Sequence, residues 1–121
     1  MPPVGYVYDP LYLEHEMPGH PESPARLRAV VAHLEESGVL ARLTKIEPRD
    51  ATPADIELLH SREHAARVRG AAEGGGAQTG VAWLDPDTYV VPRSYEAALR
   101  AVGGLLAATD AVLGGDVGSA F

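Results

Sequence analysis

Apolar side chains recur with helical spacing soon after the chain begins. Four of them stand at positions i, i+3, i+4 and i+7: Leu27, Val30, Val31 and Leu34. This spacing places them on one face of a helix. Ser23 and Pro24 supply an N-cap and a first-turn proline, and Gly38 supplies a C-terminal stop. The pattern therefore predicts a helix between Ser23 and Gly38.

A longer apolar pattern runs from Ser94 to Leu113. Its stripe consists of Leu99, Val102, Leu105, Leu106, Thr109, Val112 and Leu113, and alanine fills much of the remainder. The pattern predicts a long helix, and a helix this apolar is normally buried on more than one side. If the stripe is left uncovered, we expect the chain to associate through it.

Shorter patterns predict strands and small helices. Residues 4–8 and 43–46 are rich in β-favouring apolar side chains and stop at Asp-Pro and Glu-Pro dipeptides, which indicates two strands. Thr52 and Asp55 form an approximate capping box for a short helix, and Ser61 caps another that runs through about residue 72. Because strands and helices alternate, the sequence predicts the α/β class with one structural unit.

Three segments show no steady period. Residues 11–20 carry Pro18 and Gly19 and predict a long loop, a kind of segment that is often functional. The glycine-rich residues 70–80 predict a flexible surface loop. Residues 83–92 (WLDPDTYVVP) contain two prolines and predict a further irregular stretch.

Composition narrows the possible functions. The chain has 121 residues, a formal net charge of −7 and no cysteine. The lack of cysteine excludes a disulfide framework, a thiolate zinc site, an iron–sulfur site and a cysteine nucleophile. Lys45 is the single lysine, so the basic face that nucleic acid requires is missing. The chain has no unbroken run of about 18 apolar residues and no secretion signal, so we expect no membrane partner and a cytoplasmic location.

The long loop carries the first candidate site. His15 and His20 lie there together with Glu14, Glu16 and Glu22. Imidazole and carboxylate groups can bind a metal or transfer protons. Ligands drawn from one loop lack the rigid support that such a site needs, so the alternative is that these side chains are solvated.

Asp85 and Asp87, followed by Tyr89, form a second candidate. Two carboxylates at this spacing could accept hydrogen bonds from the backbone of a substrate or hold a cation. Asp before Pro and Asp before Thr are also ordinary turn residues. From the residues alone, the turn is the favoured interpretation.

His60, Glu63 and His64 match the inverted zincin pattern H-x-x-E-H. If Ser61 caps the following helix, His60 lies outside that helix and the two rings need not share a face. A third ligand would have to come from downstream. Solvated residues at the start of a helix are the favoured interpretation.

The order of these pieces resembles the start of the histone deacetylase and acetylpolyamine amidohydrolase family. The matching segments are GYVYDP, the loop with His15, GHPESPARL at 19–27, Leu-His-Ser at 59–61 with Glu63, DTY at 87–89, and the Ala-Ala and Gly-Gly pairs at 97–98 and 103–104. The H-P-E-x-P-x-R part is the most specific. The likeness is greatest to the class II-like, bacterial branch, and nine Arg against one Lys also favour a bacterial source.

The resemblance implies an arginase-like α/β fold with a central, mainly parallel sheet flanked by helices. Residues 1–121 would be the N-terminal segment of that domain. The family's chemistry is zinc-dependent hydrolysis of amides, with acetylated lysine or acetylated polyamines as substrates. No residue matches a zinc ligand or the catalytic tyrosine, and those parts are expected after Phe121. We therefore expect no catalytic residue, no bound zinc and no activity in this chain alone.

The resemblance also assigns roles on the rim of the substrate channel. It places His15 and His20 in a rim loop, and it gives Asp87, or Asp85 in a less favoured register, the position that hydrogen-bonds a substrate's backbone. Three further residues match the exit of the loop into the first helix and would be structural: Pro21, Glu22 and Arg26. Glu22 and Arg26 stand four residues apart, which suits an ion pair. The alternative is a non-enzymatic homologue that acts as an interaction module and self-associates through the helix around Leu99 to Leu113.

Overall fold

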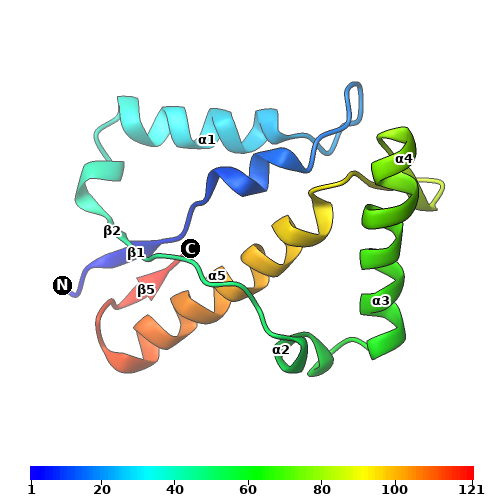
Figure 1. The fold of residues 1–121 in the computed structure, drawn as a ribbon. Helices are drawn as coiled ribbons and strands as arrows, with labels where there is room; N and C mark the ends of the chain where they lie inside the picture. The colour runs from blue at the N-terminus through cyan, green and yellow to red at the C-terminus, as the bar shows by residue number, and fades with distance from the viewer.

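A three-stranded parallel sheet lies at one end of the molecule. In the computed structural model, which describes residues 1–121, β1 (Val4–Tyr6) lies between β2 (Thr44–Lys45) and β5 (Ser119–Ala120). Gly5 stands opposite Thr44 on one side and Ala120 on the other, and both neighbours run parallel to β1. Both chain ends lie beside this sheet (Figure 1). A parallel sheet with helices around it confirms the predicted α/β class.

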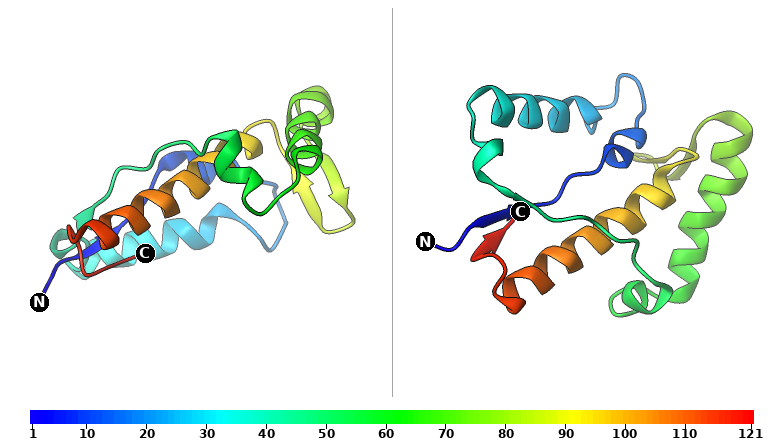
Figure 2. Two further views of the ribbon diagram at one scale, coloured as in Figure 1. Left: turned by 90° about the horizontal axis from the view of Figure 1, so that it is seen from below. Right: turned by 60° about the vertical axis from the view of Figure 1, so that its left-hand side comes forward.

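Two long helices flank the N-terminal part of the chain. They are α1 (Pro24–Glu36) and α5 (Ser94–Gly114), and both pack against the 3-10 helix η1 (Pro10–Glu14). The predicted cap of α1 is confirmed, because the Ser23 side chain accepts a hydrogen bond from the Ala25 amide. The helix stops before Gly38, which has a φ of 70°. Figure 2 shows α1 and α5 on either side of the segment that leaves β1.

The short predicted helices are also present. They are α2 (Pro53–Glu57) and α3 (Arg62–Ala71), and a 3-10 turn η2 (Leu40–Arg42) precedes β2. Thr52 and Asp55 form the complete capping box, and the Ser61 hydroxyl accepts from the His64 amide. The 3-10 helix η1 begins at Pro10 and occupies the first part of the segment at residues 11–20 that we predicted as loop. Its start is stabilised by the Asp9 carboxylate, which accepts from the Leu11 amide.

The prediction of a flexible loop at residues 70–80 is wrong. The chain continues from α3 as a π-helical segment, η3 (Ala72–Gly76), and then as α4 (Ala77–Thr79). Ala72 is buried, and a Cβ added to Gly76 would lie 3.2 Å from the Ala71 oxygen and 3.4 Å from the Val90 oxygen. The small size of glycine suits this close approach of the helix to other backbone, and the packing outweighs glycine's low helix propensity.

The prediction of an irregular stretch at residues 83–92 is also wrong. An antiparallel hairpin forms from β3 (Ala82–Asp85) and β4 (Thr88–Val90), with Trp83 opposite Tyr89. Pro86 falls in the turn, where it removes no ladder hydrogen bond. The hairpin lies with α3 and α4 at the end of the molecule away from the sheet (Figure 1).

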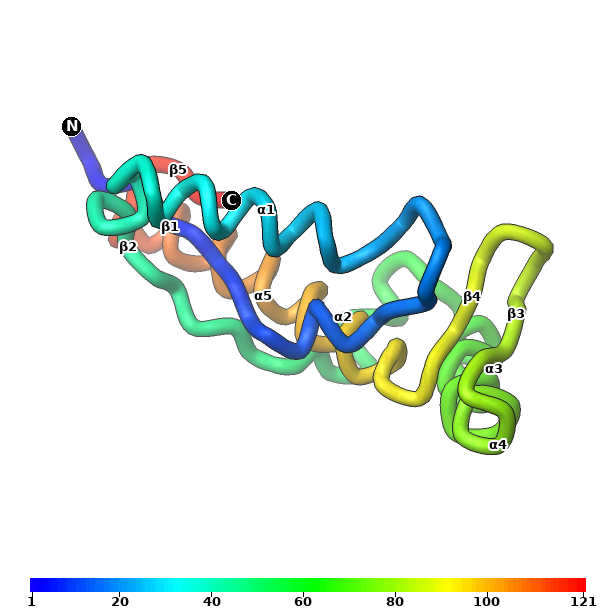
Figure 3. Tube along the Cα trace, turned by 90° about the horizontal axis from the view of Figure 1, so that it is seen from above, coloured from blue at the N-terminus to red at the C-terminus, as the bar shows by residue number.

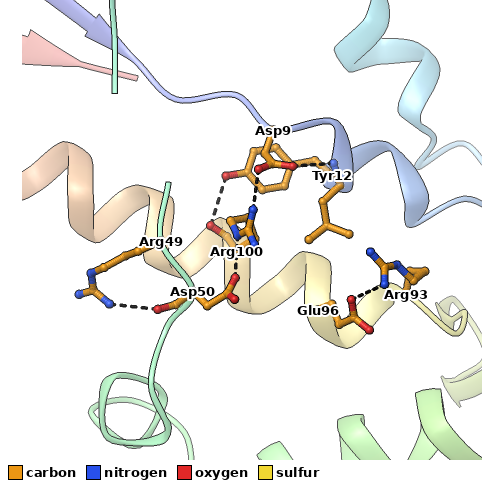
Figure 4. Close-up of polar contacts among 8 residues, drawn as sticks. Asp9, Tyr12, Arg49, Asp50, Arg93, Glu96 and Arg100 are labelled. Atoms are coloured by element: carbon orange, nitrogen blue, oxygen red, sulfur yellow. Dashed lines mark hydrogen bonds and ion pairs between the residues drawn. The ribbon is translucent and has the colours of Figure 1, made fainter. Parts of the chain in front are cut away.

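Close packing holds α5 against the rest of the chain. A Cβ added to Gly103 would lie 1.8 Å from the Arg49 oxygen, and one added to Gly104 would lie 2.8 Å from the Tyr12 hydroxyl. Beside this contact, the Arg100 guanidinium bonds to Asp9 at 2.7 Å and to Asp50 at 2.6 Å (Figure 4). These contacts join α5 to the segments that follow β1 and β2.

The prediction that α5 is buried on more than one side is wrong within residues 1–121, because one side of the helix is exposed. Leu105 is 70% exposed and Leu113 is 82% exposed. By length and composition alone, α5 is also long and apolar enough to cross a membrane. The sequence did not indicate this, because only unbroken apolar runs were considered. Core helices of globular proteins meet the same criterion, so this finding is weak evidence for a membrane span.

The surroundings of Gly103 and Gly70 predict opposite effects on stability when each glycine is replaced by alanine. We expect Gly103→Ala to lower the free energy of unfolding by about 2 kcal/mol or more, because the methyl group would overlap backbone. Gly70→Ala on α3 has open space around the added Cβ and should stabilise the protein by about 0.5–1 kcal/mol. Urea unfolding measures both. Equal stability of the two variants would contradict the packing described.

Candidate functional site

The rim loop (residues 15–22) and the β3–β4 hairpin meet at Tyr89. Figure 3 shows the rim loop beside β4, at the end of the molecule away from the sheet. Tyr89 is the one large side chain that is fully buried. Its hydroxyl lies 3.2 Å from the His15 carbonyl and 3.0 Å from the Glu22 carbonyl, and it shares its proton between them. Burial, followed by the charges of Glu22 and Glu16, raises the pKa of Tyr89, so the phenol remains a donor.

The His15 side chain packs on the ring of Tyr89. The two rings stack with centroids 4.3 Å apart and planes 7° apart. His15 Nδ1 lies 2.6 Å from the Ser94 hydroxyl oxygen, which accepts from the Val91 amide. Ser94 is therefore able to donate to a neutral imidazole. Burial lowers the pKa of His15, and the nearby Glu22 charge opposes this effect, so the neutral form is favoured near pH 7.

His20 and Asp87 are brought together by the same cluster. The His20 ring packs edge to face on Tyr89 at 4.9 Å and lies 6.5 Å from the Trp83 ring. Its Nε2 atom lies 3.3 Å from Asp87 Oδ1. The family resemblance placed the rim loop and the turn with Asp85 and Asp87 on the rim separately. In the structure the two segments contact each other and form one surface.

The two aspartates of the hairpin turn have different surroundings. Asp85 accepts from the Asp87 amide at 2.8 Å and from the Thr88 hydroxyl at 2.7 Å, which is the turn favoured from the sequence. These two hydrogen bonds, that from Thr88 first, lower the pKa of Asp85. The Asp87 side chain is 93% exposed and accepts no hydrogen bond. Asp87 is thus the carboxylate of this turn that is free to bind another molecule.

The predicted ion pair between Glu22 and Arg26 is not found. Glu22 stands one residue before the N-cap Ser23, so it does not have the helical geometry that places positions i and i+4 side by side. The backbone of Glu22 acts instead, because its amide donates to His20 Nδ1 and its carbonyl accepts from Tyr89. Arg26 is exposed on α1, and Pro21 joins His20 to Glu22.

The zincin pattern does not develop into a site. Ser61 is the N-cap, so His60 lies outside α3 as expected, although the His60 and His64 rings lie 5.0 Å apart and stack. No three His, Asp or Glu side chains come together in a way that could hold a metal ion. These residues therefore do not fit a zinc site, and we assign no step of a reaction to a metal on this chain.

Sequence reasoning missed two members of the cluster, Ser94 and Trp83, and the linking role of Tyr89. The carbonyl partners of Tyr89 lie 74 and 67 residues away, so no local pattern indicates them. A cavity of about 340 Å³ opens beside the cluster, and its wall is mostly apolar with the His15 and Ser94 side chains in it.

The hydroxyl of Tyr89 predicts a measurable loss of stability. We expect Tyr89→Phe to lower the free energy of unfolding by about 1–2 kcal/mol, because two carbonyls lose their donor. Tyr95→Phe is the control, since the Tyr95 hydroxyl makes no hydrogen bond, and it should change stability by less than about 0.5 kcal/mol. Thermal or urea unfolding measures the stability of both variants. A Tyr89→Phe variant as stable as the control would show that the hydroxyl does not hold the rim loop.

Comparison with known proteins identifies the fold and the family. The histone deacetylase domain family matches residues 20–121. A solved structure of the HDA15 HD domain superposes with a TM-score of 0.88 at 28% identity, over 98% of this chain and 34% of that chain.

Two curated relatives are similar in sequence. A probable deacetylase of Methanothermobacter thermautotrophicus is 36% identical over 110 residues, which is 90% of this chain and 31% of the relative. A histone deacetylase-like amidohydrolase of Pseudomonas aeruginosa is 33% identical over 103 residues, which is 85% of this chain and 26% of the relative. The chain spans about a third or less of the relatives that it matches. Since the family match covers most of its residues, the chain belongs to the histone deacetylase family.

Proposed function

We propose that residues 1–121 supply the outer rim of the substrate site in a deacetylase that hydrolyses acetylated lysine or acetylated polyamines. The observation that carries the proposal is the free carboxylate of Asp87, which lies 3.3 Å from His20 of the rim loop. A carboxylate that accepts hydrogen bonds from amide or ammonium groups makes stronger contacts than a neutral acceptor. Both proposed substrate classes carry such donors, because a peptide with acetyl-lysine has backbone amides and an acetylated polyamine has ammonium groups several carbons from the acetylated nitrogen.

The assignment favours Asp87 over Asp85. Asp85 uses both carboxylate oxygens within the turn, on the Asp87 amide and the Thr88 hydroxyl. A substrate would have to break these bonds in order to use Asp85. Asp85 therefore shapes the turn, and Asp87 presents the acceptor.

The hydrolytic chemistry is proposed to lie outside these residues. Members of the family are generally zinc-dependent, and zinc activates water and polarises the carbonyl group that is attacked. This chain holds no group of side chains that fits the metal. We therefore expect the purified chain not to hydrolyse an acetyl-lysine reporter, and its contribution is to bind and orient the substrate.

A chimera tests the proposed rim. The chain replaces the matching residues of the Pseudomonas amidohydrolase, and hydrolysis of an acetyl-lysine peptide is measured. We expect Asp87→Ala to raise KM about tenfold or more with kcat largely retained, because a charge-assisted hydrogen bond to the substrate is lost. Asp110→Ala, on α5 and away from the rim, is the matched control. An unchanged KM in the Asp87→Ala chimera would refute the proposed role.

The exposed side of α5 favours a second candidate, an interaction module that self-associates. Leu105 and Leu113 are 70% and 82% exposed, and Phe121, near Leu105, is 61% exposed. A hollow of about 220 Å³ runs between them, lined by Leu105, Ala108, Thr109, Val112, Leu113 and Ala120. An apolar surface of this kind is typical of sites that bind another protein surface.

Light scattering tests self-association. We expect the chain to be larger than a monomer, and we expect Leu105→Ser with Leu113→Ser to shift it toward the monomer because both side chains belong to the apolar surface. The pair Leu58→Ser with Leu59→Ser is the control, since these residues are 77% and 91% exposed but lie between α2 and α3. A monodisperse monomer in the unmodified chain would exclude this candidate.

A further inference from the structure

His20 lies between the rim loop and the turn that carries Asp87. Its side chain is 12% exposed, in contrast to the nearly complete exposure of Asp87. The ring packs edge to face on Tyr89 and lies at 51° to the Trp83 ring. Two aromatic side chains of the hairpin therefore fix the place and the tilt of the imidazole.

The backbone determines which nitrogen of His20 carries the proton. Nδ1 accepts a hydrogen bond from the Glu22 amide at 3.1 Å. A neutral imidazole that accepts through Nδ1 carries its hydrogen on Nε2. Nε2 is buried without a hydrogen-bond partner, and Asp87 Oδ1 lies 3.3 Å from it.

The 3.3 Å between Nε2 and Oδ1 is slightly longer than a usual N–H···O hydrogen bond, and Nε2 has no hydrogen-bond partner in this conformation. Asp87 accepts no other hydrogen bond, and its exposed side chain is free to rotate. A small rotation would align Oδ1 with the Nε2–H group. Such a rotation is favoured because a buried N–H without a partner is unfavourable.

We propose that His20 is a positioning residue, which donates from Nε2 to Asp87 Oδ1 and leaves Oδ2 to accept from an amide of the substrate. The inference rests on the proposed function, since it requires that Asp87 faces the substrate. A carboxylate that is already oriented loses less conformational freedom when the substrate binds. His20 thus acts through Asp87 and does not itself touch the reacting atoms.

Nuclear magnetic resonance of the chain tests the contact without any catalysis. Long-range proton–nitrogen spectra should show His20 protonated on Nε2, with a proton that exchanges slowly. In Asp87→Ala this proton should exchange about three to ten times faster, while Nδ1 remains the acceptor. A proton on Nδ1, or an exchange rate that Asp87→Ala leaves unchanged, would overturn the proposal.

Two substitutions in the chimera test the consequence for binding. The side-chain amide nitrogen of Gln reaches the position of Nε2 and can replace it as a donor. The shorter side chain of Asn reaches only the position of Nδ1. We expect His20→Asn to raise KM about three- to tenfold with kcat retained, and His20→Gln to remain near the parent. His20→Asn combined with Asp87→Ala should be no worse than Asp87→Ala alone, because the two residues act as a unit.

The outcomes separate the two proposals. If Asp87→Ala raises KM but His20→Asn does not, or if His20→Gln is as damaging as His20→Asn, the positioning role fails and the proposed rim stands. If Asp87→Ala leaves KM unchanged, the proposed function fails. The exchange measurement then still decides whether His20 binds Asp87.

Discussion

The burial of one tyrosine hydroxyl between two carbonyls organises the candidate site. The Tyr89 phenol bridges the His15 and Glu22 carbonyls, which are the two ends of the rim loop. The loop has no regular secondary structure of its own across residues 15–22, so its shape depends on contacts from outside. Tyr89 provides them from β4, where its side chain is buried, while Asp87 lies two residues earlier in the exposed turn that precedes the strand.

The long helix α5 connects this site to the sheet. Ser94 at its first turn bonds to His15, Arg100 in its middle bonds to Asp9, and Gly103 packs on the segment that follows β2. One rigid element therefore fixes the rim loop, the exit of β1 and the exit of β2 relative to one another. This explains why a chain with few fully buried side chains still holds a defined arrangement at its rim.

The sequence predicted the elements whose signals are local. The caps at Ser23, Thr52 and Ser61 could be identified because each hydroxyl bonds to an amide two or three residues later. The turn at Asp85 could be identified for the same reason. The class of fold followed from the alternation of strands and helices.

The rest depended on contacts between distant segments. The helical course of residues 72–79 requires the packing of Gly76 against the end of β4, which glycine content alone does not indicate. The hairpin was missed because Pro86 was taken to interrupt a strand when it lies in the turn. The same limit applied to the site: the sequence singled out His20 and Asp87 separately, and only the fold shows that they meet.

The most direct test of the account is a crystal structure of the chimeric deacetylase with an acetyl-lysine peptide bound. We predict that the Asp87 carboxylate lies about 3 Å from an amide nitrogen of the peptide, while Asp85 keeps its bonds within the turn. A peptide that occupies the site without contacting Asp87, or that contacts Asp85 in its place, would contradict it.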